Sequence, residues 1–272
     1  MNTKHVKLPE DNEVLDFLFQ GTEETVPAIT ESAKAESDNE QKTFEWHLAR
    51  IDKFTGSKIG DLMKQGRGKG EQWGETAKSV IFEMFTLQNM TDEGRAEYIY
   101  QQMKKDFIQT RWGNDNESFA RELYCEKTGF EVVVNGFTVN PDCEYHGGSF
   151  DGEVVGQKGI IEIKCPFDPM KHMKNVNLSR TGIDSTFEHY PQIQSNIETA
   201  KAEWCDFISF DPRQRDEYKI VIIRVMRDQF FIDAMMNRVH DAKSILDMMN
   251  NGVSIENAIK QIADYDKAIS NI

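Results

Sequence analysis

The stretch Gly148–Pro166 constrains the fold of this chain more than any other part of its sequence. Two apolar runs in it are separated by Gly156-Gln-Lys-Gly159, a combination typical of a tight turn, so the stretch predicts a β-hairpin. The first run carries an acid, Asp151, and the second carries Glu162 and Lys164. Because side chains alternate between the faces of a strand, Glu162 and Lys164 share a face.

The turn decides which residues face each other across this hairpin. If Val155 faces Ile160 across a four-residue loop, Asp151 lies opposite Lys164 and diagonal to Glu162. Cross-strand neighbours stand about 5 Å apart and diagonal ones about 7 Å apart, so the three polar groups meet on one face. Apolar side chains of the other face are expected to pack against a helix: Val154, Ile161 and Ile163.

Two acids beside a lysine on a central strand favour metal-dependent chemistry. Carboxylates repel each other and resist burial, and a hard divalent cation, Mg²⁺ or Mn²⁺, removes that conflict because it prefers oxygen ligands. Such a cation polarises a phosphoryl oxygen and activates a water, and an amine orients that water or offsets charge. From these residues alone, a surface salt bridge between Lys164 and the acids Asp151 and Glu162 remains the alternative.

The rest of the chain alternates between helical and extended patterns. Helices are expected at 44–50, 57–63, 72–90, 92–109, 114–128, 186–202, 229–249 and 254–270, and strands at 130–134, 137–139, 148–155, 160–165, 204–210 and 218–226. Helices around a mixed central sheet indicate the α/β or α+β class. Residues 1–43 are expected to form an acidic arm or linker, with a short amphipathic helix near Val14–Phe19.

Charge is spread unevenly along the chain, which has a net charge of −14. Residues 1–43 hold ten acids and four bases, whereas the stretch Arg50–Lys69 holds six bases and two acids. A negative chain is not typical of a nucleic-acid coat protein. The local basic stretch either serves a polyanion or is a solvated helix face.

Several function classes find no support in the sequence. No run of about 18 apolar residues predicts a membrane span, and the first residues lack the apolar core of a secretory signal. The four cysteines lie far apart, so a disulfide framework is not expected, and none follows Cys205 to complete an iron–sulfur cluster. The six histidines form no HExxH pattern, which argues against a zinc hydrolase.

Short motifs follow one another in order across roughly residues 44–226. They are Trp46-His-Leu-Ala-Arg50 with Thr55-Gly-Ser57, Trp112-Gly-Asn-Asp-Asn-Glu117, Ser149-Phe-Asp151-Gly, Glu162-Ile-Lys164-Cys-Pro166, Tyr190-Pro-Gln-Ile-Gln194 and Phe210-Asp-Pro-Arg213. Together they resemble the lambda exonuclease and YqaJ viral recombinase family of the PD-(D/E)xK nuclease superfamily. One departure is Phe150, which stands where the family has proline.

The resemblance implies a role for each matching position. Asp151 and Glu162 would bind the metal with the carbonyl of Ile163, Lys164 would position the attacking water, and Glu117 would hold a second ion or a metal-bound water. Four further residues would contact the phosphate at the DNA end, with Tyr190 and Gln194 beside them as weaker candidates. The four are Arg50, Ser57, Ser149 and Gln192.

The resemblance also implies a fold and an activity. A restriction-endonuclease-like core at 44–226 would carry an N-terminal arm, 1–43, and a C-terminal helical extension, 227–272, packed on it. The enzyme would be a Mg²⁺-dependent exodeoxyribonuclease that digests double-stranded DNA ends 5′-to-3′, releases mononucleotides and leaves 3′ single-stranded tails for recombination. A ring-shaped homotrimer, a single-strand annealing protein as partner, no contact with a membrane, and the cytoplasm of a phage-infected or prophage-bearing cell are implied as well.

Two other functions remain open at this point. The same core serves endonucleases such as restriction enzymes, and a DNA-binding or interaction module can keep the core after its active site has degenerated. The intact set of Asp151, Glu162 and Lys164 argues against the second alternative.

Overall fold

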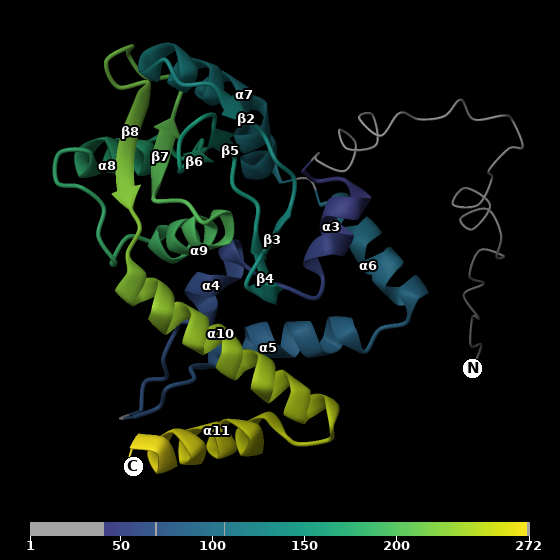
Figure 1. The fold of residues 1–272 in the computed structure, drawn as a ribbon. Coiled ribbons are helices and arrows are strands. Elements are labelled where there is room, and N and C mark those ends of the chain that lie inside the picture. The colour runs from purple at the N-terminus through teal and green to yellow at the C-terminus, as the bar shows by residue number, and fades with distance from the viewer. Residues whose placement is uncertain (1–40, 69, 106, 271–272) are drawn as a thin grey trace, which may run out of the picture. The chain divides into compact units, whose positions relative to one another are not determined.

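A five-stranded mixed sheet lies at the centre of the computed structural model, which describes residues 41–68, 70–105 and 107–270 (Figure 1). Its strand order is β2-β5-β6-β7-β8, and β6 and β7 run parallel while the other neighbours are antiparallel. The strands are β2 (Val132–Val133), β5 (Gly152–Val154), β6 (Gly159–Lys164), β7 (Trp204–Phe210) and β8 (Ile220–Met226). The mixed sheet with its flanking helices confirms the predicted α/β fold class.

A smaller three-stranded sheet stands beside it, in the order β1-β4-β3. Its strands are β1 (Phe54–Thr55), β3 (Thr138–Asn140) and β4 (Cys143–Gly148). The sequence patterns had not predicted β1 or β4, because β1 has two residues and β4 is rich in glycine and polar side chains. The parallel pairing of β1 with β4 sets the start of the next helix beside the chain that leads to Ser149.

Helices cover both faces of the central sheet (Figure 1). In chain order they are α3 (Phe44–Arg50), α4 (Gly56–Leu62), α5 (Glu75–Gln88), α6 (Asp92–Met103), α7 (Ile108–Thr128), α8 (Pro169–Leu178), α9 (Tyr190–Ala200), α10 (Gln229–Asn250) and α11 (Ile255–Ser270). Helix α8 was not predicted, although Asp168 accepts from the amide of Met170 as its N-cap and Pro169 occupies its first turn. The helix expected near Val14–Phe19 lies outside the described residues.

The hydrophobic core consists of two clusters, one on each face of the central sheet, because successive side chains of β6 and β7 point to opposite faces. Ile161 and Ile163 pack with Val154 against α7, as the hairpin pattern predicted. Ile160 and Phe207 face the other way, into a larger cluster shared with α4, α5, α9 and α10. Glu162 is two residues after Ile160 and lies on the same face of β6, so its side chain is directed toward α9. The division into an arm, a nuclease domain and a C-terminal extension stays a prediction, although α10 contributes to the main core.

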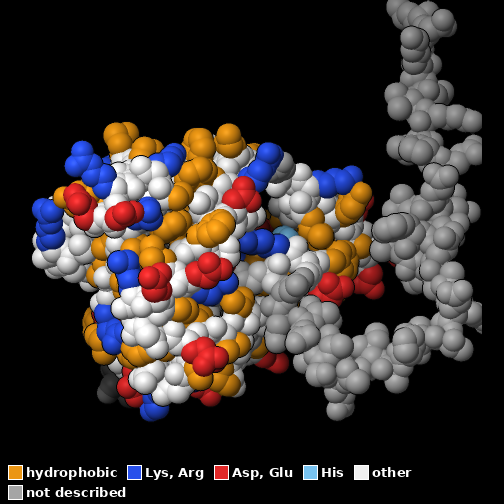
Figure 2. All heavy atoms as spheres, turned by 90° about the horizontal axis from the view of Figure 1, so that it is seen from above, with side chains coloured by type: hydrophobic (Ala, Val, Ile, Leu, Met, Phe, Trp, Pro, Cys, Tyr) orange, Lys and Arg blue, Asp and Glu red, His pale blue; other side chains and the backbone are white. Residues whose placement is uncertain are grey.

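One face of the molecule has a mixed charge. On the face shown in Figure 2, Lys and Arg side chains stand beside Asp and Glu side chains, with hydrophobic groups between them. No single sign covers that face, so a local cationic site is compatible with the net charge of −14. Among the described residues, no helix combines the length and the apolar character needed to cross a membrane.

Candidate active site

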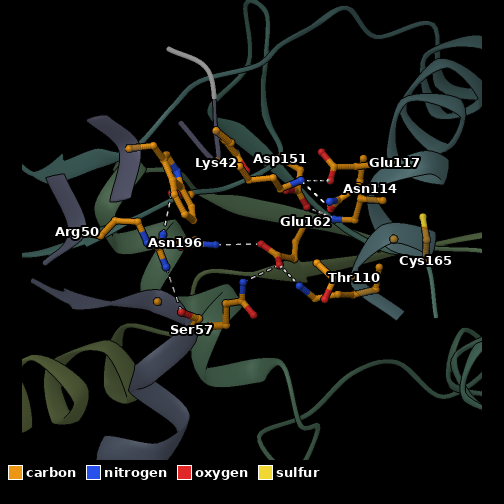
Figure 3. A pocket seen from close by; sticks show the side chains of 18 residues that line it. Lys42, Arg50, Ser57, Thr110, Asn114, Glu117, Asp151, Glu162, Cys165 and Asn196 are labelled. Carbon is orange, nitrogen blue, oxygen red and sulfur yellow. Dashed lines mark hydrogen bonds and ion pairs between the residues drawn. The ribbon is translucent and has the colours of Figure 1, made fainter. Parts of the chain in front are cut away.

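A pocket of about 340 Å³ opens where the ends of β5 and β6 meet α3, α4, α7 and α9 (Figure 3). Nine of the positions singled out from the sequence line it. They are Arg50, Ser57, Glu117, Ser149, Asp151, Glu162, Ile163, Lys164 and Gln192. Residues separated by more than 140 positions in the chain thus share one cavity.

Asp151 is fixed against the strand that carries Glu162. Its amide donates to the carbonyl of Ile161 at 3.0 Å, and its Oδ2 accepts from the amide of Ile163 at 2.5 Å. These contacts on both sides of Glu162 place the two acids beside each other. Burial and the Glu162 carboxylate hold the pKa of Asp151 well above its usual range.

The register of the hairpin differs from the prediction by two residues. Glu153, not Val155, faces Ile160, so Asp151 lies beside Glu162 rather than opposite Lys164. The turn starts earlier than expected, with Gly156 at a positive φ of 71°, and Gly159 already belongs to β6. Gly159 lies under the indole of Trp204, where an added Cβ would come within 2.2 Å of the ring. A shift by two residues keeps the same face, so the acids and the lysine still meet.

Glu162 is 1% exposed and is held by three donors. Its Oε1 accepts from Lys164 at 2.6 Å and from Gln192 at 2.7 Å, and its Oε2 accepts from Asn196 at 2.9 Å. Gln192 and Asn196 are one helical turn apart on α9, so a single helix face restrains the carboxylate. Figure 3 shows the bond from Asn196 to Glu162.

Lys164 provides a fixed positive charge at the same place. Burial alone would lower its pKa, but the carboxylates of Glu162 and Asp151 outweigh that effect and raise the pKa of Lys164 to about 12. The neighbouring thiol of Cys165 also lines the pocket, and burial raises the pKa of Cys165 to about 12. Lys164 is therefore a charged donor, and Cys165 is a protonated thiol rather than a nucleophile.

Glu117 reaches the pocket from α7. Its Oε1 accepts from Arg121 at 2.9 Å, and its Oε2 lies 3.7 Å from the amine of Lys42. Lys42 donates in turn to Asn114 at 2.8 Å. Glu117 is thus partly exposed and turned toward the other acids, where it can approach an ion directly or through water.

Arg50 lies across the pocket from the acids (Figure 3). Its guanidinium donates to Ser149 at 3.0 Å and to Ser57 at 3.4 Å, and it lies 4.1 Å from the ring centre of Trp46. Trp46 donates to the same Ser149 hydroxyl at 3.0 Å. Burial lowers the pKa of Arg50 to about 10, and no described carboxylate forms an ion pair with it. A half-buried cation whose described partners are neutral is suited to an anionic ligand.

Two of the predicted site residues lie elsewhere. Gln194 is fully buried, donates to the carbonyl of Met226 at 2.9 Å and accepts from the amide of Asp228. Tyr190 donates its hydroxyl to the carboxylate of Asp228 at 2.8 Å. Neither lines the pocket, because residues four apart share a helix face and this face of α9 points toward the start of α10. Their contacts are with the start of α10 and the end of β8, and their role at the phosphate stays a prediction.

Asn196 is the main residue that the motifs did not identify. It is 1% exposed, and its buried Oδ1 has no hydrogen-bond partner in the described structure. A Cβ at Gly148 would lie 2.3 Å from this oxygen, and one at Gly56 would lie 2.7 Å from it. Both glycines are thus required where the chain passes Asn196. The spacing of four from Gln192 was the available signal, since it puts both amides on one helix face.

The oxygens of the pocket fit a hard divalent cation. Asp151, Glu162 and the Ile163 carbonyl supply the ligand type that Mg²⁺ and Mn²⁺ prefer. The raised pKa of Asp151 reflects two buried carboxylates in conflict, which a cation would relieve. Within the described ranges, no three His, Cys, Asp or Glu side chains are preassembled as a metal cluster. Water would complete the coordination, as is usual for Mg²⁺.

Comparisons with known proteins show the family and the fold of the chain. The family model of the YqaJ-like viral recombinase domain matches residues 45–203, more than half of the chain. An alkaline exonuclease from Laribacter hongkongensis is 25% identical, with a TM-score of 0.62 over 82% of this chain and 100% of that one. Its complex with dAMP matches equally well, at 26% identity.

A more distant structure supports the fold alone. A phage-related exonuclease from Haemophilus somnus 129PT is 19% identical, with a TM-score of 0.55 over 74% of this chain and 96% of that one. Among curated protein sequences, none matches the chain.

Proposed function

The chain belongs to the family of YqaJ-like viral recombinase domains, and we propose that it is a Mg²⁺-dependent exodeoxyribonuclease. It digests double-stranded DNA from its ends in the 5′-to-3′ direction, releases mononucleotides and leaves 3′ single-stranded tails. One observation carries the proposal. The pocket joins Arg50, a half-buried cation with no ion pair to a described carboxylate, to two buried acids and a lysine. The similarity to an exonuclease crystallised with dAMP also supports the proposed exonuclease activity.

The residues divide the work between anchoring and hydrolysis. Arg50, Ser57, Ser149 and Gln192 bind the terminal 5′ phosphate, which fixes the distance from that phosphate to the next bond. Asp151 and Glu162 hold the divalent cation with the Ile163 carbonyl. When bound there, the cation supplies Lewis-acid polarisation of the scissile phosphoryl group. Lys164 orients the attacking water and offsets the charge that develops on the phosphoryl oxygens.

Anchoring the terminal phosphate explains why the enzyme digests DNA from its ends. A terminal phosphate enters the cradle of donors around Arg50, whereas an uninterrupted strand has no terminus to place there. The test uses linear duplex labelled at either end, with and without a 5′ phosphate, beside a covalently closed circle. We expect Mg²⁺-dependent nucleotide release from the phosphorylated linear substrate and none after chelation. Cutting of the circle would identify an endonuclease, and no release from any substrate would identify a binding module.

We also propose that the chain forms an oligomer and binds a partner protein. A ring-shaped homotrimer around DNA and a single-strand annealing protein as partner follow from the family resemblance. Light scattering of the purified chain, alone and with a candidate annealing protein, tests both. A monomer at all concentrations would remove the ring from the proposal.

A further inference from the structure

Lys42 is a pocket residue that none of the sequence motifs contains. It lines the active-site cavity together with Glu117 and Asp151, and 47% of its side chain is exposed. Its amine donates to Asn114 at 2.8 Å and lies 3.7 Å from Oε2 of Glu117. Figure 3 shows this side chain reaching toward both residues. The amine is therefore inside the site and still accessible to a ligand.

The backbone around Lys42 is held in an unusual conformation. The φ of Lys42 is 73°, a left-handed value that residues other than glycine seldom adopt. On one side, the amide of Gln41 donates to the carbonyl of Phe150 at 3.2 Å. On the other side, the Thr43 hydroxyl accepts from the amide of Trp46 at 3.2 Å and caps α3. A lysine stands where glycine would be less strained, which favours a functional role for its amine.

The charges of the pocket show which cations already have a partner. Glu162 accepts from Lys164 at 2.6 Å, and Glu117 accepts from Arg121 at 2.9 Å. Two of the lining acids are thus paired with protein cations. Among the described residues, the charged groups that line the pocket are Glu117, Asp151, Glu162, Lys42, Arg50 and Lys164.

Lys42 is the more loosely held of the two cations beside Glu117. Its distance of 3.7 Å from this carboxylate is beyond hydrogen-bond range, whereas Arg121 bonds to it at 2.9 Å. Arg50 has no ion pair to a described carboxylate, and in the proposed function it binds the terminal phosphate. The strand brings a second phosphate beside the first one, at the scissile bond. Lys42 is therefore the lining cation best placed to bind that second phosphate.

We propose that Lys42 is a further catalytic residue, which binds the phosphate of the scissile bond. The inference rests on the proposed function, which places the terminal phosphate at Arg50 and the scissile phosphoryl group at Asp151 and Glu162. The amine of Lys42 donates to a non-bridging oxygen of the scissile phosphoryl group from the Glu117 side of the site. Such a charged donor binds more strongly as negative charge develops on these oxygens in the transition state.

The experiment removes one charge from the protein and one from the DNA. Linear 5′-phosphorylated duplex is made with an uncharged methylphosphonate at either the first or the second linkage of the 5′ strand. Binding is measured in the Lys164→Ala background, which prevents digestion. The test variant is Lys42→Gly, because glycine adopts a positive φ without strain and the backbone is preserved.

We expect Lys42→Gly to weaken binding of unmodified DNA on the order of tenfold, as for a lost bond from a charged group. It should weaken binding equally with the methylphosphonate at the second linkage. It should cause no further loss with the methylphosphonate at the first linkage, because the charge that it contacts is already absent. The slope of log affinity against log salt should fall by about 0.7 to 0.9, as for one phosphate contact.

Turnover separates Lys42 from the phosphate anchor. With Lys164 intact, Lys42→Gly should lower single-turnover nucleotide release by about 100-fold. The loss should be the same on 5′-phosphorylated and 5′-hydroxyl ends, because Lys42 does not contact the terminal phosphate. Lys42→Arg should recover most of the rate, since it restores the charge.

Controls distinguish this role from a structural one. Lys64→Ala should change nothing, because Lys64 pairs with Asp61 and lines neither the pocket nor the second cavity, of about 270 Å³, that Lys53 lines beside Arg50. If Lys42→Gly does not fold, Lys42→Asn replaces it, since asparagine also tolerates a positive φ.

Two results would overturn the inference. One is an unchanged affinity of Lys42→Gly for unmodified DNA, and the other is an equal loss on DNA with the methylphosphonate at the first linkage. Failure of the proposed function looks different, because the wild-type protein would then release no nucleotide from any end.

Discussion

The Nδ2 atom of Asn196 donates to Oε2 of Glu162 at 2.9 Å, and both side chains are 1% exposed. Through this bond, helix α9 holds the carboxylate of Glu162 in place. Gln192, one turn earlier, restrains the other oxygen. The donors of α9 therefore set the direction in which Glu162 presents its remaining lone pairs.

Asn196→Ala should raise the Mg²⁺ concentration needed for activity and lower turnover by about 10- to 100-fold, the usual effect of removing a group that orients a metal ligand. The measurement is nucleotide release from linear duplex against Mg²⁺ concentration. Asn89→Ala, which removes an exposed amide bonded to Asn250, serves as the control. An Asn196→Ala enzyme with wild-type Mg²⁺ dependence would contradict the positioning role.

Lys164→Ala should lower the rate of nucleotide release by about 100-fold or more, because the amine that stabilises developing charge is lost. Binding to DNA ends should persist, since the phosphate cradle is untouched. Single-turnover digestion and an end-binding assay measure the two effects separately. Undiminished turnover in this variant would remove Lys164 from the mechanism.

Arg50→Ala should abolish the preference for 5′-phosphorylated over 5′-hydroxyl ends. A bond from a charged group contributes about 1.5–3 kcal/mol, so affinity for the phosphorylated end should fall by roughly tenfold to a hundredfold. Arg50→Lys should recover part of the loss, because the charge returns without the bidentate fork. Equal losses on both kinds of end would indicate that Arg50 supports the fold rather than the phosphate.

Arg224→Ala should destabilise the fold without changing the site. Arg224 donates twice to the buried Asp206, each bond 2.8 Å long, and Tyr124 donates to the same carboxylate. Loss of the arginine leaves a buried charge short of a partner, which costs about 3 kcal/mol in the free energy of unfolding. Lys158→Ala, which breaks an exposed pair with Glu203, should stay within about 1 kcal/mol. Urea titration distinguishes the two.

His146 should make stability depend on pH. Asn140 donates to its Nδ1 and its Nε2 donates to Ser195, so the buried ring is neutral, and burial lowers the pKa of His146 to about 4. In the unfolded chain the ring takes up a proton near pH 6.5, before the folded protein does. Its contribution is therefore complete above about pH 6.5 and is lost as pH falls toward 4, by roughly 3 kcal/mol at most.

Unfolding at about pH 7.5 and about pH 5 measures this dependence. His146→Gln should flatten the difference, because the amide does not titrate in this range. A variant with the same pH dependence as the wild type would assign the effect to other groups.

The alternation of Asp151, Glu162 and Lys164 across a glycine turn was sufficient to predict which residues share a face, since strand periodicity is a local property. Periodicity also predicted the long helices α10 and α11 within a residue or two. It missed β1 and β4, which pair with each other from distant parts of the chain. The fold class and the family therefore follow from local pattern and motif order.

By itself, the sequence determined that two acids and a lysine meet on one face of a hairpin, and that a basic stretch follows Arg50. Tertiary structure alone decided the rest: that the hairpin pairs Glu153 with Ile160, that Asn196 restrains Glu162, and that Lys53 lines a second cavity while Lys64 does not. The reason is physical. Strand and helix periods act between neighbours in the chain, whereas these contacts depend on how separate elements pack, and packing is decided by the whole core.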